Sequence, residues 1–384
     1  MKFNLTEEQL MIQQSAREFA ENEIKDAIER DEKSEFPYEI VMKLGELGLL
    51  GMMVPPEYDG AGMDTISYVL AMEEISKADA SVGVIMSVNN SLICWGVNEY
   101  GTPEQKEKYL RPLAKGQKDG KLYIGAFCLS EPNAGSDATA QTTTAQKDGN
   151  HYILNGTKNW ITNGTTSEFY MVFAMTDKSK GSHGISCFMV ERDTPGFEIL
   201  KKEKKLGIRS SDTCSLGFSD CRIPKENLLG AEGEGFKIAM KTLDGGRIGI
   251  AAQALGIAAA SLERSLRYAK ERHSFGKMII EHQAIQMKLA DMATELDAAR
   301  LLTLQAAWLK DQHQRYSAQS AMAKLYASRI AVKAALEAIQ IHGGYGYVQE
   351  YEVERYLRDA KITEIYEGTS EVQHIVIARD LLRA

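Results

Sequence analysis

The sequence lacks the markers of several large classes of protein. Its 384 residues include five cysteines, which lie far apart and form no Cys-x-x-Cys pair, so neither a disulfide framework nor a metal site is predicted. No run of eighteen apolar residues is present, and a membrane-spanning helix is not expected. No run of Lys and Arg stands out, and the formal net charge is -8. A nucleic-acid-binding surface, which must neutralise phosphates, is not expected either.

Common catalytic and targeting signatures are absent as well. The chain has no Gly-x-Gly-x-x-Gly after a strand, no Gly-x4-Gly-Lys, no His-Glu-x-x-His and no Gly-x-Ser-x-Gly, so hydride chemistry on a Rossmann domain is not expected. The N-terminus opens with the capping box Thr6-Glu7-Glu8-Gln9 and shows no apolar signal region or Arg-rich transit segment. These features predict a cytoplasmic protein with reduced thiols.

Hydrophobic periodicity divides the chain into three regions. Helical spacing runs from residue 6 to about 116, and strand-like runs follow from about 121 to 220. Long Ala-rich helices are predicted at 236–272, 283–312 and 317–342. We therefore predict an α+β multidomain protein with a helical domain at 1–120, a β domain at 121–232 and a four-helix bundle at 233–384.

The β region has short apolar runs separated by turn residues. The runs are 122–129, 152–154, 169–174 and 185–190, and Asp148-Gly149 carries a hairpin signal. No helix-length spacers separate these runs, so an antiparallel barrel or sandwich is predicted.

Glu367 is the first candidate for a catalytic group. A helix is predicted from Arg355 to Ile365, and Ser370 with Gln373 forms a capping box that opens a last helix ending near Leu382. Glu367 then lies in a short loop, followed by Gly368, which allows a ligand close to the backbone. From the residues alone, a solvated turn carboxylate is the commoner alternative.

Three further clusters could bind a ligand. The run from Phe127 to Asp137 exposes hydroxyls and backbone N–H groups in one loop, and Asn159 to Gly164 places Trp160 beside a hydroxyl at a turn. For Trp160 alone, a buried core position is the favoured alternative. The run from Gln340 to Tyr347 ends a helix in glycines, which commonly serve only as a cap, and His342 there is more often structural than catalytic.

Two of these clusters resemble the signatures of the acyl-CoA dehydrogenases. Cys128-Leu129-Ser130-Glu131-x-x-Ala134-Gly135-Ser136-Asp137-x-x-Ala140 is similar to the first family signature. Gln340-x-x-Gly343-Gly344-x-Gly346-Tyr347-x-x-Glu350-x4-Arg355-x3-Asp359 is similar to the second. The resemblance covers essentially the whole chain and is strongest to the short-chain, butyryl-CoA members.

The resemblance implies non-covalent FAD and a homotetramer, a dimer of dimers, in which a neighbouring subunit completes each flavin site. The residues that it places at the flavin are Phe127, Leu129, Ser130, Gly135, Ser136, Trp160, Ile161, Thr162, Arg272, Ser274, Phe275, Gln283, Gln340, Gly343, Gly344, Thr369 and Glu371. The residues that it places at the acyl-CoA are Ser136, Asp244, Arg247 and Gly368. From the residues alone, an ion pair between helices is the simpler interpretation of Arg247.

The resemblance also gives Glu367 a role. It falls on the family's catalytic base, and the alternative base position of other branches is Gly246 here, which cannot abstract a proton. The implied reaction removes the α-proton and passes the β-hydrogen as hydride to the flavin, converting butyryl-CoA to crotonyl-CoA or running in reverse. An electron-transferring flavoprotein is the implied redox partner.

Other functions on the same fold are left open by the sequence. They are a glutaryl-CoA or branched short-chain dehydrogenase, an acyl-CoA oxidase and a non-catalytic flavoprotein scaffold. The oxidases are usually much longer chains, and a scaffold would be expected to lack the base.

Overall fold

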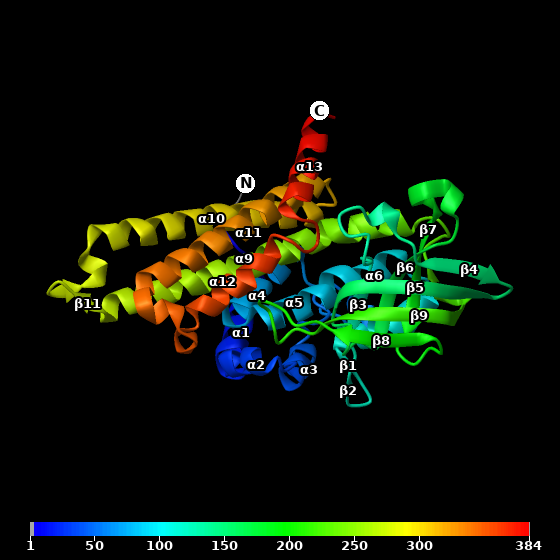
Figure 1. Ribbon diagram of the computed structural model, residues 1–384, viewed down its shortest axis with the longest axis horizontal. Helices are drawn as coiled ribbons and strands as arrows, with labels where there is room; N and C mark the ends of the chain where they lie inside the picture. Colours follow the sequence, from blue (N-terminus) through cyan, green and yellow to red (C-terminus); the bar gives the residue numbers. More distant parts are fainter. Residues whose placement is uncertain (1–3, 384) are drawn as a thin grey trace.

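The protein combines two helical parts with one sheet. The computed structural model describes residues 4–383. Figure 1 shows long C-terminal helices extending to one end of the molecule, a sheet at the other end and the N-terminal helices beneath them. The predicted order of helical domain, β domain and helical bundle is therefore confirmed.

The N-terminal part is helical up to Lys115. The predicted capping box at Thr6 is present, and Thr102 forms a second one, with Gln9 N and Gln105 N donating to the hydroxyls of Thr6 and Thr102. Its helices are α1 Glu7–Glu23, α2 Ala27–Lys33, α3 Tyr38–Glu46, α4 Thr65–Ala78, α5 Ala80–Ser87, α6 Trp95–Tyr100, α7 Pro103–Gln105 and α8 Arg111–Lys115. Two π-helical segments, η2 Val88–Cys94 and η3 Lys106–Leu110, join α5 to α6 and α7 to α8.

The segment Ala80–Tyr100 is apolar and long enough to cross a membrane by composition alone. However, 94% of its most apolar window is buried inside the protein. Its buried side chains join the helical core, as those of Ile85 and Ile93 show. A helix of this kind is the expected centre of a folded domain.

The sheet of the middle part contains eight strands. They are β3 Gly125–Cys128, β4 Thr144–Asp148, β5 His151–Thr162, β6 Phe169–Met175, β7 Ile185–Glu191, β8 Phe197–Lys202, β9 Thr213–Pro224 and β10 Leu228–Leu229. Their order is β10-β7-β6-β4-β5-β9-β8, with β3 also paired to β6. The two-residue strands β1 Gln117–Lys118 and β2 Lys121–Leu122 form a separate ribbon before it.

The predicted antiparallel pairing is correct for most of the sheet and wrong where β3 and β4 pair with β6. Strand β3 runs parallel to β6 along its whole length, and β4 also meets the end of β6 in parallel. A parallel pair needs a long connection, and the hairpin of β4 and β5 supplies it between β3 and β6. The turn of that hairpin contains Gly149 with φ +59°, as the Asp-Gly signal predicts.

Strand β6 joins the sheet to the helices. Alternate side chains of a strand point to opposite faces. Phe169, Met171 and Phe173 belong to the core shared with the helices, whereas Tyr170 and Val172 belong to the inner core of the β domain. The strand is buried on both faces, which fixes the β domain against the bundle.

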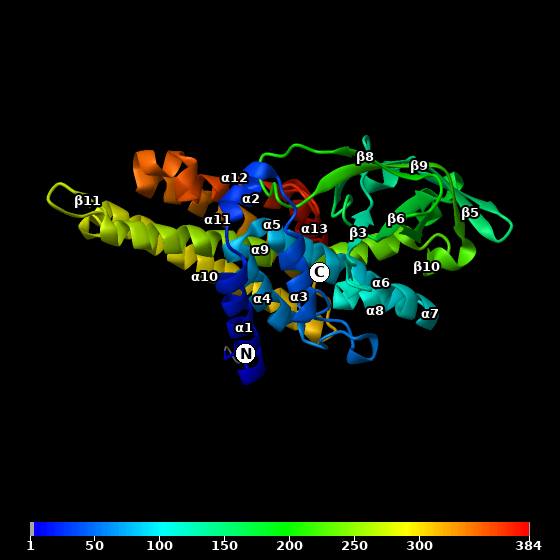
Figure 2. The same ribbon diagram turned by 90° about the horizontal axis from the view of Figure 1, so that it is seen from below.

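The C-terminal part is a bundle around one long central helix. Its helices are α9 Gly235–Glu271, α10 Gln283–Asp311, α11 Ser317–His342, α12 Val353–Thr363 and α13 Ser370–Leu381. Helix α9 packs against α11, α10, α12 and also α4, so it lies at the centre of the helical core. Figure 2 shows α9, α10 and α11 side by side, with the hairpin of β11 His273–Ser274 and β12 Lys277–Met278 at their far end.

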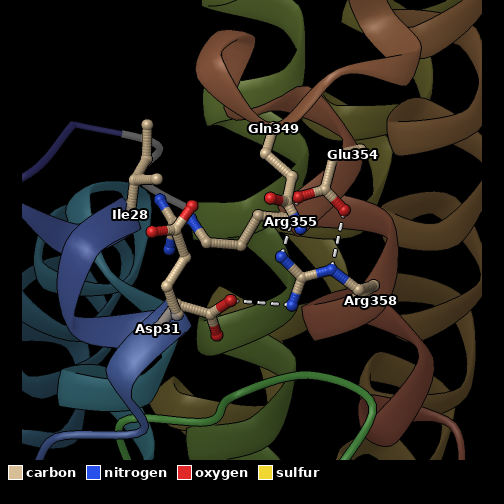
Figure 3. A pocket seen from close by; sticks show the side chains of 7 residues that line it. Ile28, Asp31, Gln349, Glu354, Arg355 and Arg358 are labelled. Atoms are coloured by element: carbon tan, nitrogen blue, oxygen red, sulfur yellow. Dashed lines mark hydrogen bonds and ion pairs between the residues drawn. The ribbon is translucent and has the colours of Figure 1, made fainter.

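Helix α12 is tied to the N-terminal part by buried and half-buried charges. The Arg358 guanidinium binds Asp31 of α2 at 2.8 Å and Glu354 at 2.7 Å (Figure 3). The cavity between these side chains is about 10 Å³, the size of a single water. Asp359 accepts from the Ile208 N–H at 2.5 Å, which adds a link to the segment between β8 and β9. The end of α12, where Glu367 follows, is therefore held from two sides.

Candidate active site

Glu367 lies in the loop between α12 and α13, as predicted, and this loop has an unusual backbone. Glu367 has φ +52° and Gly368 has φ +95°, both in the left-handed region. The Ser370 N–H donates to the Glu364 carbonyl at 3.0 Å and closes the loop. A non-glycine residue in this conformation must be held there by its surroundings.

The predicted start of the last helix is wrong by one residue. The capping residue is Thr369, whose hydroxyl accepts from the Val372 N–H at 3.3 Å, and Ser370 is the first helical residue. No capping box forms, because the Gln373 side chain instead donates to the Gly368 carbonyl at 2.7 Å. Gln373 thus stabilises the loop of Glu367 rather than its own helix end.

The Glu367 carboxylate is directed into the protein. Glu367 is half-buried as a residue, but its Oε2 atom is inaccessible and has no hydrogen-bond partner within residues 4–383. That atom occupies the space beside Gly246 of α9, where any Cβ would overlap it. Burial raises the pKa of Glu367 to about 7, although the charges of Lys324 and Arg247 oppose the rise.

Asp244 and Arg247 both lie on α9, and the charge of Arg247 acts on Glu367. Arg247 pairs with Asp244 at 2.5 Å, and the Ser317 hydroxyl donates to the other oxygen of Asp244. Arg247 is buried, and its Nε has no partner within the described residues. The ion pair expected from sequence alone is present within α9 rather than between helices.

The loop from Phe127 to Ser136 is supported by a buried ion pair. Lys158 Nζ binds Glu131 at 2.8 Å and the Leu129 carbonyl at 3.0 Å. Asn159 N donates to the Ser130 carbonyl at 2.9 Å, so the first turn of the loop lies against β5. Gly135 has no atom near the position of a Cβ, which leaves the far side of the loop open.

Trp160 lies on this side of the β domain, and its prediction needs two corrections. It belongs to strand β5 rather than to a turn, and its side chain is 62% exposed rather than buried. The register between β5 and β9 shifts from Lys158 to Ile161, and Trp160 has φ +62° in this bulge. The bulge turns the indole outward, whereas Ile161 enters the inner core of the β domain. Thr162, the last residue of β5, follows it.

Most of the other predicted cofactor residues gather at the end of the bundle that lies away from the β domain. A cavity of about 570 Å³ lies there, and its walls include Tyr268, Arg272, His342, Gly343, Gly344 and Tyr345. Gln340 precedes these glycines on α11, Ser274 and Phe275 lie on the β11–β12 hairpin, and Gln283 is the first residue of α10. Phe275 is 97% exposed.

The structure therefore separates most of the predicted cofactor residues into two groups. Figure 1 shows the β11 hairpin at one end of the molecule and β5 at the other. Glu367, Gly368, Thr369 and Glu371 lie between the two groups, at the start of α13. One chain cannot bring the two groups to the same part of one cofactor molecule.

The sequence prediction missed the role of two residues that bind the loop of Glu367. Lys324 of α11 is fully buried and donates from Nζ to the Gly368 carbonyl at 2.8 Å. Gln373 is also buried and binds the same carbonyl. The sequence did contain a feature that could have identified Lys324. It is a lysine among the alanines of a predicted bundle helix, and Ala323, Ala327 and Ala331 all face the core. A lysine on such a face needs a specific partner.

The side chains suit a large planar cofactor with a polar tail. An exposed indole beside an open loop offers a flat apolar face with hydrogen-bond donors next to it. At the other end, no described residue approaches the positions where a Cβ of Gly343 or Gly344 would lie, and Arg272 stands over the Tyr345 ring at 5.6 Å. Such a glycine-lined cavity with an arginine suits a phosphate-containing group.

Comparison with known proteins identifies the family. Models of the acyl-CoA dehydrogenase N-terminal, middle and C-terminal domains match residues 6–117, 126–221 and 233–382. The chain belongs to the acyl-CoA dehydrogenase family. It is an FAD-dependent enzyme, and its similar relatives include short-chain members.

Three relatives illustrate the similarity. The short-chain specific acyl-CoA dehydrogenase of Clostridium acetobutylicum is 51% identical over 384 residues, covering 100% of both chains. The butyryl-CoA dehydrogenase of Megasphaera elsdenii has a TM-score of 0.97 with 49% identity, covering 100% of both chains. A chain solved in a study of the electron transferring flavoprotein of Acidaminococcus fermentans has a TM-score of 0.98 with 52% identity and the same coverage.

Proposed function

We propose that this enzyme catalyses the α,β-dehydrogenation of short-chain acyl-CoA thioesters, with Glu367 as the base that removes the α-proton. Butyryl-CoA is the proposed substrate and crotonyl-CoA the product. The observation that carries the proposal is the Glu367 carboxylate, whose inner oxygen is buried and has no partner within the described chain. The short-chain relatives support the substrate class.

The position of Glu367 suits proton abstraction. The α-hydrogen of a thioester is weakly acidic, so a base with a pKa near neutrality is more effective than an ordinary carboxylate. Burial raises the pKa of Glu367 to about 7, which keeps the group ionisable at the pH of the cell. Within residues 4–383, the buried Oε2 atom has no hydrogen-bond partner to give up before the carboxylate reacts.

The thioester carbonyl must be polarised while the proton leaves. We assign the backbone N–H of Glu367 as one donor to that oxygen, because the left-handed loop holds this peptide in a fixed orientation. Asp244, Arg247, Ser136 and Gly368 are assigned to the CoA portion of the substrate. Gly246 leaves the space for the carboxylate that a side chain would fill.

Bound FAD supplies the hydride acceptor for the β-hydrogen. We assign Phe127, Leu129, Ser130, Gly135, Trp160, Ile161 and Thr162 to its flavin end, with Ile161 contributing its backbone because its side chain is buried. Arg272, Ser274, Phe275, Gln283, Gln340, Gly343 and Gly344 are assigned to the polar tail, with Thr369 and Glu371 beside it.

The separation of these two groups supports a shared site. The residues assigned to the flavin end and those assigned to the polar tail lie at opposite ends of one chain. The residues around Arg272 of one subunit would therefore bind the tail of the FAD whose flavin lies beside Trp160 of another subunit. We therefore propose a homotetramer built as a dimer of dimers. The exposed Phe275 at the hairpin tip provides an apolar contact for such an assembly.

The redox partner is proposed to be an electron-transferring flavoprotein, in a cytoplasmic setting. The similar chain from the Acidaminococcus fermentans study supports this partner. Either direction of the reaction is compatible with the same residues, since the group that removes the α-proton in oxidation returns it in reduction.

The function is tested by anaerobic reduction of the purified yellow protein. We expect butyryl-CoA to bleach the wild-type flavin, and Glu367→Gln to bind FAD normally but to bleach about 10⁴-fold more slowly. Glu29→Gln is the matched control, because Glu29 forms an exposed ion pair with Lys33 on α2, and its rate should change by less than about threefold. Bleaching of the Glu367 variant at the wild-type rate would exclude Glu367 as the base.

Acyl-CoA substrates of different length and branching test the substrate class. We expect the highest kcat/KM for the C4 thioester, because each methylene in an apolar pocket contributes about 1–3 kcal/mol of discrimination. A higher kcat/KM for glutaryl-CoA or a branched thioester would replace the proposed substrate while leaving the base unchanged.

A further inference from the structure

Lys324 is the buried lysine beneath the loop of the base. It lies on α11, its side chain is 0% exposed, and its Nζ is 2.8 Å from the Gly368 carbonyl oxygen. Within residues 4–383 it forms no ion pair with a carboxylate. A buried ammonium group needs a specific partner. Here the partner is the backbone carbonyl of the residue that follows the proposed base, and this position requires a functional explanation.

Gln373 completes the contact from the other side. Its Nε2 donates to the Gly368 carbonyl at 2.7 Å and approaches the Glu367 carbonyl at 3.4 Å. The two peptide groups that follow the base are therefore held by side chains from α11 and α13. These contacts oppose relaxation of Glu367 from its left-handed conformation.

Two cations lie near the base, and Lys324 is the one that has no carboxylate partner among residues 4–383. The other nearby cation, Arg247, is already paired with Asp244. The titratable groups that face Glu367 or Lys324 are Tyr68 from α4, Arg247 from α9, and Glu364, Tyr366 and Glu371 from the loop and its flanks. A direct ion pair would fix the carboxylate and weaken it as a base.

We propose that Lys324 is a positioning residue for the base: it fixes the Gly368 carbonyl and favours the ionised Glu367 carboxylate without pairing with it. This inference rests on the proposed role of Glu367 and extends it. Lys324 does not contact the reacting atoms, so its effect passes through the loop and through the electric field at Glu367.

The ionisation of both groups agrees with this assignment. Burial raises the pKa of Glu367 to about 7, and the Lys324 charge limits that rise. Burial also lowers the pKa of Lys324 to about 8, against the opposing charge of Glu367. Between these values the lysine is charged and the glutamate ionised, which is the productive combination.

The test compares three substitutions of Lys324 with a control on the same helix. Lys324→Met removes both donor and charge, Lys324→Gln keeps a donor without charge, and Lys324→Arg keeps both. The control is Lys333→Met, since Lys333 is on α11 but exposed and paired with Glu295. The readout is the second-order rate constant of flavin bleaching by butyryl-CoA in the holoenzyme, measured against pH.

We expect Lys324→Met to move the acid limb of this profile up by about one pH unit. Its plateau above the limb should fall about tenfold, because the loop is less well fixed. Lys324→Gln should recover part of the plateau but keep the displaced limb, and Lys324→Arg should keep the wild-type limb. Lys333→Met should match the wild type in both.

An infrared titration separates the ionisation of Glu367 from turnover. The protonated-carboxyl band that the wild-type holoenzyme shows and Glu367→Gln lacks should titrate at higher pH in Lys324→Met than in the wild type. FAD content and thermal midpoint are measured for each variant. If Lys324→Met does not fold, the test is the comparison of the other two variants: the acid limb should be displaced in Lys324→Gln and unchanged in Lys324→Arg.

The outcomes distinguish this inference from the proposed function. If butyryl-CoA does not bleach the wild type, the proposed function fails. If the wild type bleaches and Glu367→Gln does not, but the Lys324 variants keep the wild-type limb and infrared titration, only the inference is overturned.

Discussion

Glu131 and Glu367 are two enclosed carboxylates in different parts of the molecule, and each has a buried lysine nearby. Glu131 binds Lys158 at 2.8 Å and accepts from the N–H groups of Thr142 and Thr143. Burial acts to raise the pKa of Glu131, but Lys158 and these donors outweigh it and lower the pKa to about 2. Glu131 is therefore a permanent anion that fixes a loop.

Glu367 shows the opposite arrangement. Its lysine, Lys324, donates to the neighbouring Gly368 carbonyl instead of to the carboxylate. The buried Oε2 of Glu367 has no partner in the described part of the chain, so burial dominates and raises the pKa of Glu367 to about 7. The comparison teaches that hydrogen-bond partners, and not burial alone, distinguish a structural carboxylate from one suited to proton transfer.

The largest effect on stability is expected at the paired site. Lys158→Met leaves Glu131 as an uncompensated buried charge and should lower the free energy of unfolding by about 3–5 kcal/mol. Lys201→Met, which removes one partner of an exposed pair with Glu203, should cost less than about 1 kcal/mol. Urea denaturation of both variants measures the difference, and equal losses would contradict the structural role of Lys158.

A somewhat smaller effect on stability, of opposite sign, is expected for a substitution of Glu367. The folded-state pKa of Glu367 is above its ordinary 4.5, so ionising it costs stability as pH rises from 4.5 through about 7. Glu367→Gln should therefore be more stable than the wild type by roughly 3 kcal/mol at pH 8, at 1.36 kcal/mol per pKa unit. The gain should disappear below about pH 4.5.

The paired site gives the reverse dependence on pH. The folded-state pKa of Glu131 is lowered, so its contribution is present above its ordinary 4.5 and is lost as pH falls towards about 2. The unfolding free energies of Glu131→Gln and Glu367→Gln are measured across this range and compared with the wild type. At neutral pH, Glu131→Gln should be less stable than the wild type and Glu367→Gln more stable. Parallel curves would contradict the difference between the two sites.

The smallest expected effect comes from adjacent glycines of α9. A Cβ at Gly246 would overlap the Glu367 carboxylate and lie 2.7 Å from Leu92, so Gly246→Ala should slow bleaching by roughly 10–100-fold. A Cβ at Gly245 would meet no atom closer than 3.7 Å, so Gly245→Ala is the control and should keep the wild-type rate. Equal rates for both variants would show that the carboxylate does not need this space.

Local sequence patterns predicted local structure well. The capping box at Thr6 depends on residues three positions apart, and it formed. The predicted cap of α13 at Ser370 was wrong. Gln373 has the spacing of a capping box, but its side chain binds the Gly368 carbonyl of the folded loop instead. Neighbouring positions could not reveal that competition.

The distinction between the two glutamates depends on contacts far apart in the chain. Both lie in loops with turn-forming neighbours, and nothing adjacent separates them. The partner of Glu131 is 27 residues away, and Lys324 is 44 residues from the carbonyl that it binds. Trp160 is a similar case, because the bulge that turns it outward depends on the register with β9.

The pH dependence of flavin reduction at low substrate tests the central claim most directly. With butyryl-CoA far below saturation, the rate constant reports the ionisation of groups in the free enzyme. Ionisation of Glu367 predicts an acid limb near pH 7, with bleaching lost as pH falls below it and lost at all pH values in Glu367→Gln. A wild-type rate that stays constant down to pH 5, or a variant that follows the wild-type profile, would contradict the account.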